Sequence, residues 1–160
     1  MKNSIRFFAI SIFLFTLISC GDNYNDSNDG PSITTFTATI NGANEVPANN
    51  STATGTATLL FNNTTKTFSI AVTHTLSTIT MGHIHLGAAG TNGGVVFPFS
   101  SVASPIAFTS IALTPAQEAD LKANLFYVNL HSAAFPAGEI RGQLIQGATT
   151  GGRTRSGGGY

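Results

Sequence analysis

The sequence predicts an all-β domain, an immunoglobulin-like or Greek-key β-sandwich of about eight strands with one short helix. Threonine, serine, asparagine and glycine are abundant while only 9% of the residues are charged, a composition typical of extracellular β domains. Short segments alternate apolar and polar residues with a period of two, and turn residues separate them. Only one segment, 114–125, has the pattern of a helix.

The N-terminus is interpreted as a lipoprotein signal peptide that covers residues 1–19. Lys2 and Arg6 precede an apolar run at 7–18, which has the length of a signal-peptide core and is short for a membrane span. The run ends in Leu-Ile-Ser-Cys, which is similar to the lipobox of bacterial lipoproteins. Cys20 is the only cysteine, so it cannot form an intramolecular disulfide. We therefore expect Cys20 to be the lipidation site.

The rest of the chain divides into three parts. Residues 20–32 are polar and are expected to form a flexible tether, 33–146 the folded domain, and 147–160 a glycine-rich flexible tail. Without residues 1–19, five basic residues stand against seven acidic ones, a balance that argues against a nucleic-acid partner. The expected location is the bacterial cell envelope, lipid-anchored to a membrane through Cys20 and facing the periplasm or the surface.

The first three strands are predicted at 35–42, 52–62 and 66–74. Apolar residues alternate with polar ones in the first and third strands, which indicates one buried face in each. These apolar residues are Phe36, Ala38, Ile40, Phe68, Ile70 and Val72. The short segment 63–65 between the second and third strands predicts a β-hairpin.

The next three strands are predicted at 79–87, 95–99 and 106–113. A glycine-rich loop at 88–94 joins the first two. Pro98 has no backbone N–H to donate, so we expect the strand at 95–99 to lie at an edge of the sheet.

The helix is predicted at 115–124, followed by strands at 126–132 and 138–146. Thr114 stands where an N-cap belongs, Pro115 occupies the first helical position, and Gln117 completes a capping box.

Two histidines, His83 and His85, stand one residue apart in a predicted strand, so they share one face. The same rule places Asn129 and His131 on one face of a later strand, and Glu139 and Arg141 on one face of the last. In each strand an apolar stripe occupies the opposite face. If these strands are neighbours, the polar faces converge.

Several motifs occur in the order and approximate spacing found in the CHRD domain, a family named for chordin. They are "FTATINGANEVPA" (36–48), "GHIHLG" (82–87), "GGVV" (93–96), "YVNLH" (127–131) and "FPAGEIRGQL" (135–144). The domain at 33–146 therefore resembles a CHRD domain. The resemblance implies an extracellular immunoglobulin-like β-sandwich and implies little about biochemistry.

The histidines support two interpretations. His83, His85 and His131 could supply the three nitrogen ligands that suit copper or zinc, with Asn129 or Glu139 orienting a ring. Alternatively, the histidines hydrogen-bond backbone and charged groups and fix the glycine-rich loop to the last strands.

Three further residues are candidates for a role near these histidines. Arg141 is suited to holding several carbonyl oxygens as a structural clamp. Glu45 is expected to cap a strand end or to meet Arg141. His74 is a weaker candidate ligand, because its strand otherwise has a structural pattern.

The sequence favours a non-catalytic extracellular binding or structural module, with an extracellular protein or polysaccharide as the expected partner. The alternative is a copper- or zinc-binding envelope protein with a redox role. The common hydrolase and nucleotide-binding motifs are absent from the sequence. The histidine pattern is also similar to copper-zinc superoxide dismutases, but four histidines and one cysteine are too few for their binuclear site and disulfide.

Overall fold

The computed structural model describes residues 30–152, and it confirms the all-β class with one short helix. The strands in chain order are β1 (Ile33–Asn41), β2 (Thr54–Asn62), β3 (Phe68–His74), β4 (Ile79–Leu86), β5 (Gly94–Pro98), β6 (Ile106–Thr109), β7 (Phe126–Ser132), β8 (Ile140–Gln143) and β9 (Ile145–Thr150). The helix α1 (Pro115–Lys122) precedes β7, and a 3₁₀ turn, η1 (Gly42–Asn44), follows β1.

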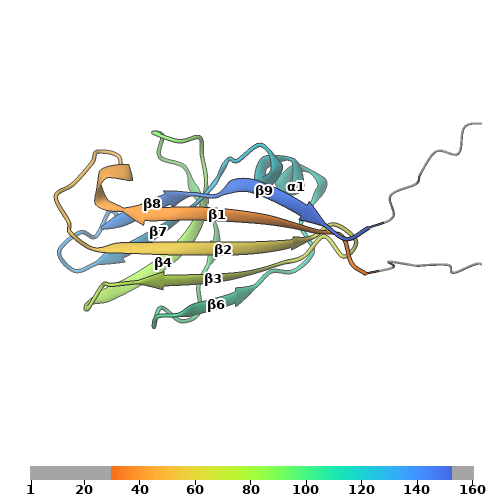
Figure 1. The fold of residues 1–160 in the computed structure, drawn as a ribbon. Coiled ribbons are helices and arrows are strands. Elements are labelled where there is room, and N and C mark those ends of the chain that lie inside the picture. Colours follow the sequence, from red (N-terminus) through yellow and green to blue (C-terminus); the bar gives the residue numbers. More distant parts are fainter. Residues whose placement is uncertain (1–29, 153–160) are drawn as a thin grey trace, which may run out of the picture.

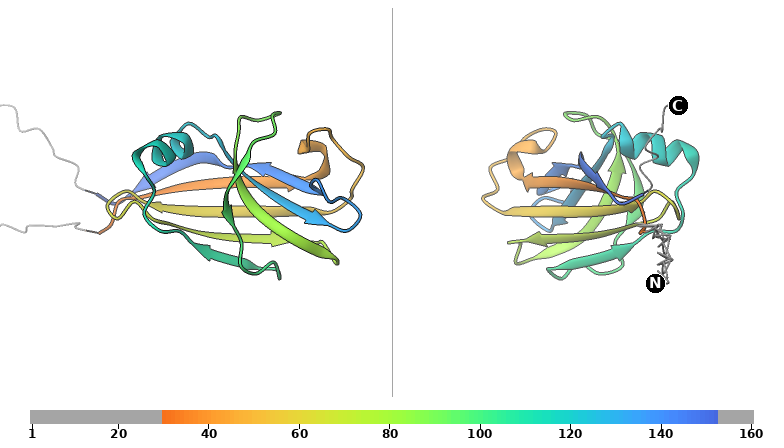
Figure 2. Two further views of the ribbon diagram at one scale, coloured as in Figure 1. Left: turned by 180° about the vertical axis from the view of Figure 1, so that it is seen from behind. Right: turned by 45° about the vertical axis from the view of Figure 1, so that its right-hand side comes forward.

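The strands form one antiparallel sheet in the order β5-β4-β7-β8-β1-β2-β3-β6, and β9 pairs with β1. The sheet curls so that its two halves lie face to face, as the views in Figures 1 and 2 show. Aromatic rings close the core where the two edge strands approach: the ring centroids of Phe97 in β5 and Phe108 in β6 are 6.1 Å apart. Pro98 lies in the edge strand β5, as predicted.

The core is made of the apolar stripes that the alternation predicted. Phe36, Ile40 and Val72 are fully buried, and cross-strand neighbours from β2, β4, β7 and β8 pack with them. Because each strand gives one face to this core, the opposite faces of β4, β7 and β8 remain free for polar groups.

The segment predicted as one strand at 138–146 is two strands, which is why nine strands form rather than about eight. Leu144 interrupts the segment: its side chain is fully buried and its N–H donates to the carbonyl of Phe126 over 2.9 Å. Before this bend β8 pairs with β7, and after it β9 pairs with β1. One continuous segment thus joins the two halves of the sheet, as strands do at sandwich corners.

The first residues of the expected tail also belong to the sheet, which corrects the boundary at 147. Strand β9 continues to Thr150 and pairs with the start of β1. The hydroxyl oxygens of Thr34 and Thr149 are 2.8 Å apart, and both threonines favour extended backbone. The glycine-rich composition of the segment concealed this pairing.

The helix has the predicted capping box, in which Thr114 and Gln117 exchange hydrogen bonds. It buries Leu121 against the core. Within residues 30–152 no helix is long and apolar enough to cross a membrane.

We expect Leu144→Ala to lower the free energy of unfolding by about 2–5 kcal/mol, because the change leaves a cavity at the bend between the two halves. Leu60→Ala is the matched control, since Leu60 is 43% exposed. Urea unfolding followed by circular dichroism measures both values. Equal losses for the two variants would show that the bend does not depend on the packing of Leu144.

Candidate metal centre

The polar faces of β4, β7 and β8 form one continuous surface, because the three strands are neighbours in the sheet. His83 lies opposite Asn129, and Asn129 lies opposite Arg141. His85 lies opposite Tyr127 in the same ladder. The side chains that sequence alternation assigned to three separate polar faces therefore meet on one surface.

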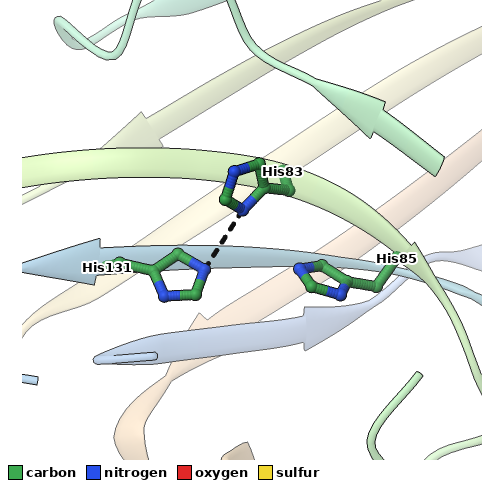
Figure 3. Close-up of side chains that lie close together, drawn as sticks. All are labelled: His83, His85 and His131. Carbon is green, nitrogen blue, oxygen red and sulfur yellow. Dashed lines mark hydrogen bonds between the residues drawn. The ribbon is translucent and has the colours of Figure 1, made fainter. Parts of the chain in front are cut away.

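Three histidines gather on this surface, as Figure 3 shows. One ring nitrogen from each of His83, His85 and His131 lies within 4.8 Å of the other two. The closest pair is Nδ1 of His83 and Nε2 of His131, at 3.2 Å. His85 and His131 are buried and His83 is half-buried. We call these three residues the histidine triad.

Backbone carbonyls fix the protons of two rings in the triad. His131 Nδ1 lies 3.0 Å from the carbonyl oxygen of Pro136, and His85 Nδ1 lies 3.0 Å from that of Gly93. A carbonyl oxygen can only accept, so both Nδ1 atoms carry the proton when the rings are neutral. The lone pairs of both rings are therefore on Nε2. The Nε2 atom of His85 is buried and has no hydrogen-bond partner.

His83 completes the arrangement. Because Nε2 of His131 has the lone pair, Nδ1 of His83 donates the proton in the hydrogen bond between them. Burial lowers the pKa of His83, and the nearby His131 and His85 lower it further. Burial also lowers the pKa of His85, although its bond to the Gly93 carbonyl opposes the shift. His83 and His85 are therefore predominantly neutral at pH 7, the state that ligates metals.

The glycine-rich loop at 87–93 is held beside the triad by Arg141. Arg141 is 2% exposed, and its guanidinium donates to the carbonyls of Ala88 and Thr91, over 3.3 and 2.6 Å, and to Oδ1 of Asn92 over 3.3 Å. Arg141 thus holds several carbonyls, the clamp that its planar donor group suits.

The Tyr127 ring connects this clamp to the triad. The Arg141 Cζ atom lies 3.4 Å from the Tyr127 ring centroid, and the His85 ring stacks on Tyr127 at 4.9 Å. The Tyr127 hydroxyl accepts the N–H of Gly93 over 3.0 Å. Gln143 donates to the Gly87 carbonyl over 3.0 Å, so both ends of the loop are fixed. Strand alternation places Tyr127 on the face of Asn129 and Gln143 on the face of Arg141, but it does not reveal that both hold the loop.

A second buried group lies beside this surface. Glu45 and Asn129 are 7% and 5% exposed, and Glu45 Oε1 and Asn129 Oδ1 have no hydrogen-bond partner. Both side chains crowd Gly138, where a Cβ would lie 2.6 Å from the carboxylate and 2.7 Å from the amide, and where φ is +140°. Burial raises the pKa of Glu45 to about 7, and the charge of Arg141 and a backbone hydrogen bond from Val46 oppose the shift.

Two of the candidate residues, Glu139 and His74, lie outside the triad's contacts, and a third, Asn129, is its neighbour only by register. Glu139 accepts a hydrogen bond from the Ser51 hydroxyl over 2.7 Å and makes no ion pair with Arg141 in the described part of the chain. His74 uses Nε2 to bond the Val102 carbonyl over 2.9 Å and belongs to β3, in the other half of the sheet. Asn129 neighbours the triad by register, but its amide end lies against Gly138.

We expect Glu45→Gln to change the pH dependence of stability. Its folded pKa of about 7 exceeds the ordinary 4.5, so the wild-type fold binds this proton more tightly than the unfolded chain does. That stabilisation is complete below pH 4.5 and is lost as pH rises to about 7. Glutamine is uncharged at every pH. The free energy of unfolding of the variant, relative to that of the wild type, should therefore rise by about 3 kcal/mol as the pH increases through this range.

The measurement is urea unfolding of both proteins at pH 4, 5.5, 7 and 8. A stability difference that stays constant between the lowest and highest pH would show that Glu45 ionises in the fold without cost.

Comparison with known protein families identifies the family of the domain. The model of the CHRD domain family matches residues 36–144, more than half of the chain, and the match includes all three histidines of the triad. No curated protein and no solved structure gives a significant match. The match confirms the resemblance that the sequence motifs indicated. The chain therefore belongs to the CHRD domain family.

Proposed function

We propose that this CHRD domain is a non-catalytic module that binds one copper or zinc ion through His83, His85 and His131. The observation that carries the proposal is the convergence of three ring nitrogens within 4.8 Å, two of them with lone pairs fixed by backbone carbonyls. Hydrogen bonds from the outer ring nitrogen to a carbonyl are the usual way in which proteins orient metal-ligating histidines.

The spacing of the triad suits these ions. Ligand distances of about 2.0–2.1 Å in a tetrahedral site place nitrogens about 3.3 Å apart. Nδ1 of His83 and Nε2 of His131 are already 3.2 Å apart, and the ring nitrogen of His85 lies within 4.8 Å of both, so a bound ion would have to draw it closer. The proton between His83 and His131 leaves Nδ1 when the metal enters, since neutral His83 can carry it on Nε2.

A purely structural role explains less of the geometry. Arg141, Tyr127 and Gln143 already hold the loop through five hydrogen bonds, so the loop does not need the triad. A clamp would also leave Nε2 of His85 buried without a partner, which costs about 1–3 kcal/mol. A bound cation uses this lone pair.

A second candidate is the binding of an extracellular protein or polysaccharide. A cavity of about 570 Å³ lies beside Arg141 and is lined by polar groups that include Asn44 and Gln143. Its volume falls in the usual range of ligand sites. Such binding would survive replacement of the three histidines, which separates it from the metal proposal.

The proposed location is the cell envelope, with the domain exported and anchored by lipid at Cys20. The support is the order of features in the sequence: two basic residues, an apolar run at 7–18 and a lipobox-like segment before the only cysteine. These residues lie outside the part of the chain that the structure describes. The polar segment at 20–32 would act as a tether between membrane and domain.

We expect His83→Ala and His131→Ala each to abolish stoichiometric binding of copper or zinc, because two imidazoles rarely hold either ion tightly. His74→Ala is the matched control, since it removes the one histidine outside the triad. Metal content after dialysis and the thermal midpoint of each apo protein are the measurements. All proteins carry Cys20→Ser so that the only thiol cannot bind the metal.

The proposal is supported if the His74→Ala control retains its metal and its thermal midpoint. The two triad variants should then lose the metal while their apo forms keep a near-normal thermal midpoint. If the parent retains no metal and both triad variants melt at a much lower temperature, the histidines are a structural clamp.

We expect Cys20→Ser in the full chain to release the protein from membranes or to block its processing, because serine offers no thiol for acylation. Fractionation of bacterial cells that express the two forms measures this. A serine variant that is still cleaved and still sediments with membranes would rule out the lipid anchor.

A further inference from the structure

We infer that Met81 supplies a thioether sulfur to the histidine triad and that the site therefore selects Cu(I) over Zn(II). The inference rests on the proposed metal function and adds the identity of the ion and a fourth ligand. Thioether sulfur is a soft ligand that favours Cu(I), whereas imidazole alone serves both copper and zinc.

The position of Met81 follows from the register of β4 and β7. Met81 stands two residues before His83, so both side chains leave the same face of β4. Met81 is also paired with His131 in the ladder. Directly opposite residues have Cβ atoms about 4.5–5.5 Å apart, within reach of a long side chain. The unbranched methionine chain can adapt its sulfur to the site.

The exposure of the surrounding side chains shows where a fourth ligand can enter. His85 is 9% exposed and lies under the loop that ends at Gly93, and His131 is 6% exposed and lies against Pro136. Of the three histidines, His83 is the most exposed, and Met81, two residues before it, is 47% exposed. Met81 is therefore a solvent-accessible neighbour of His83 on the face of β4 that carries the triad.

The charge near the triad also favours a monovalent ion. The group of ligand atoms contains no carboxylate among the described residues. The buried Arg141 guanidinium packs on Tyr127, the ring on which His85 stacks. A divalent ion held by neutral ligands beside this cation would suffer twice the repulsion of a monovalent one.

The test compares Met81→Leu with the parent, both carrying Cys20→Ser. Leucine keeps the size and apolar character of the side chain and removes only the sulfur. Cu(I) affinity is measured without oxygen by competition with a chromophoric chelator, and Zn(II) affinity by a parallel competition. Leu60→Val, at an exposed position in β2, is the control for an unrelated apolar change.

We expect Met81→Leu to weaken Cu(I) binding at least about tenfold, as loss of a supporting group does at metal sites. Zn(II) binding should change less than about threefold, because three imidazoles and water complete a zinc site. X-ray absorption of the parent loaded with Cu(I) should show one sulfur neighbour of the copper, which is lost in the variant.

Two other results would overturn the inference, and they differ from each other. If the parent and Met81→Leu bind Cu(I) equally well and no sulfur neighbour is seen, Met81 is not a ligand, while the metal function stands. If the parent binds neither Cu(I) nor Zn(II), the proposed function fails and the inference fails with it.

Discussion

The site depends on the buried guanidinium of Arg141. Arg141 holds the carbonyls of Ala88 and Thr91, and this contact keeps the glycine-rich loop against β7. The loop in turn presents the Gly93 carbonyl to Nδ1 of His85. That single hydrogen bond decides which nitrogen of His85 carries the lone pair. The lone pair of His85 therefore depends on a cation that lies two strands away, whereas the Pro136 carbonyl orients His131.

This polar surface can form because the two faces of the same strands have different surroundings. Strands β4, β7 and β8 send one face into the aromatic and aliphatic core, and the opposite face carries the triad, Tyr127 and Arg141. The bend at Leu144 then passes the chain to the other half of the sheet. The core fixes the backbone on which the triad stands, so the imidazoles are held without contributing to the apolar packing.

Much of this arrangement could be predicted from sequence, because side-chain alternation in strands is a strict geometric rule. It placed His83 with His85 and Asn129 with His131, and the capping box located α1. Alternation cannot say which strands are neighbours, so the convergence of these polar faces stayed conditional until the structure paired β4 with β7 and β7 with β8.

The backbone carbonyls of Gly93 and Pro136 were beyond sequence reasoning, because any residue could provide them once the loops were folded. The bend at Leu144 was hidden for a similar reason, since a buried leucine fits a strand equally well.

Anomalous diffraction from crystals grown with copper or zinc tests most directly whether the histidine triad binds a metal ion. We expect one peak about 2.0–2.1 Å from a ring nitrogen of each of His83, His85 and His131. Intact contact between His83 and His131 with no peak beside them would contradict it.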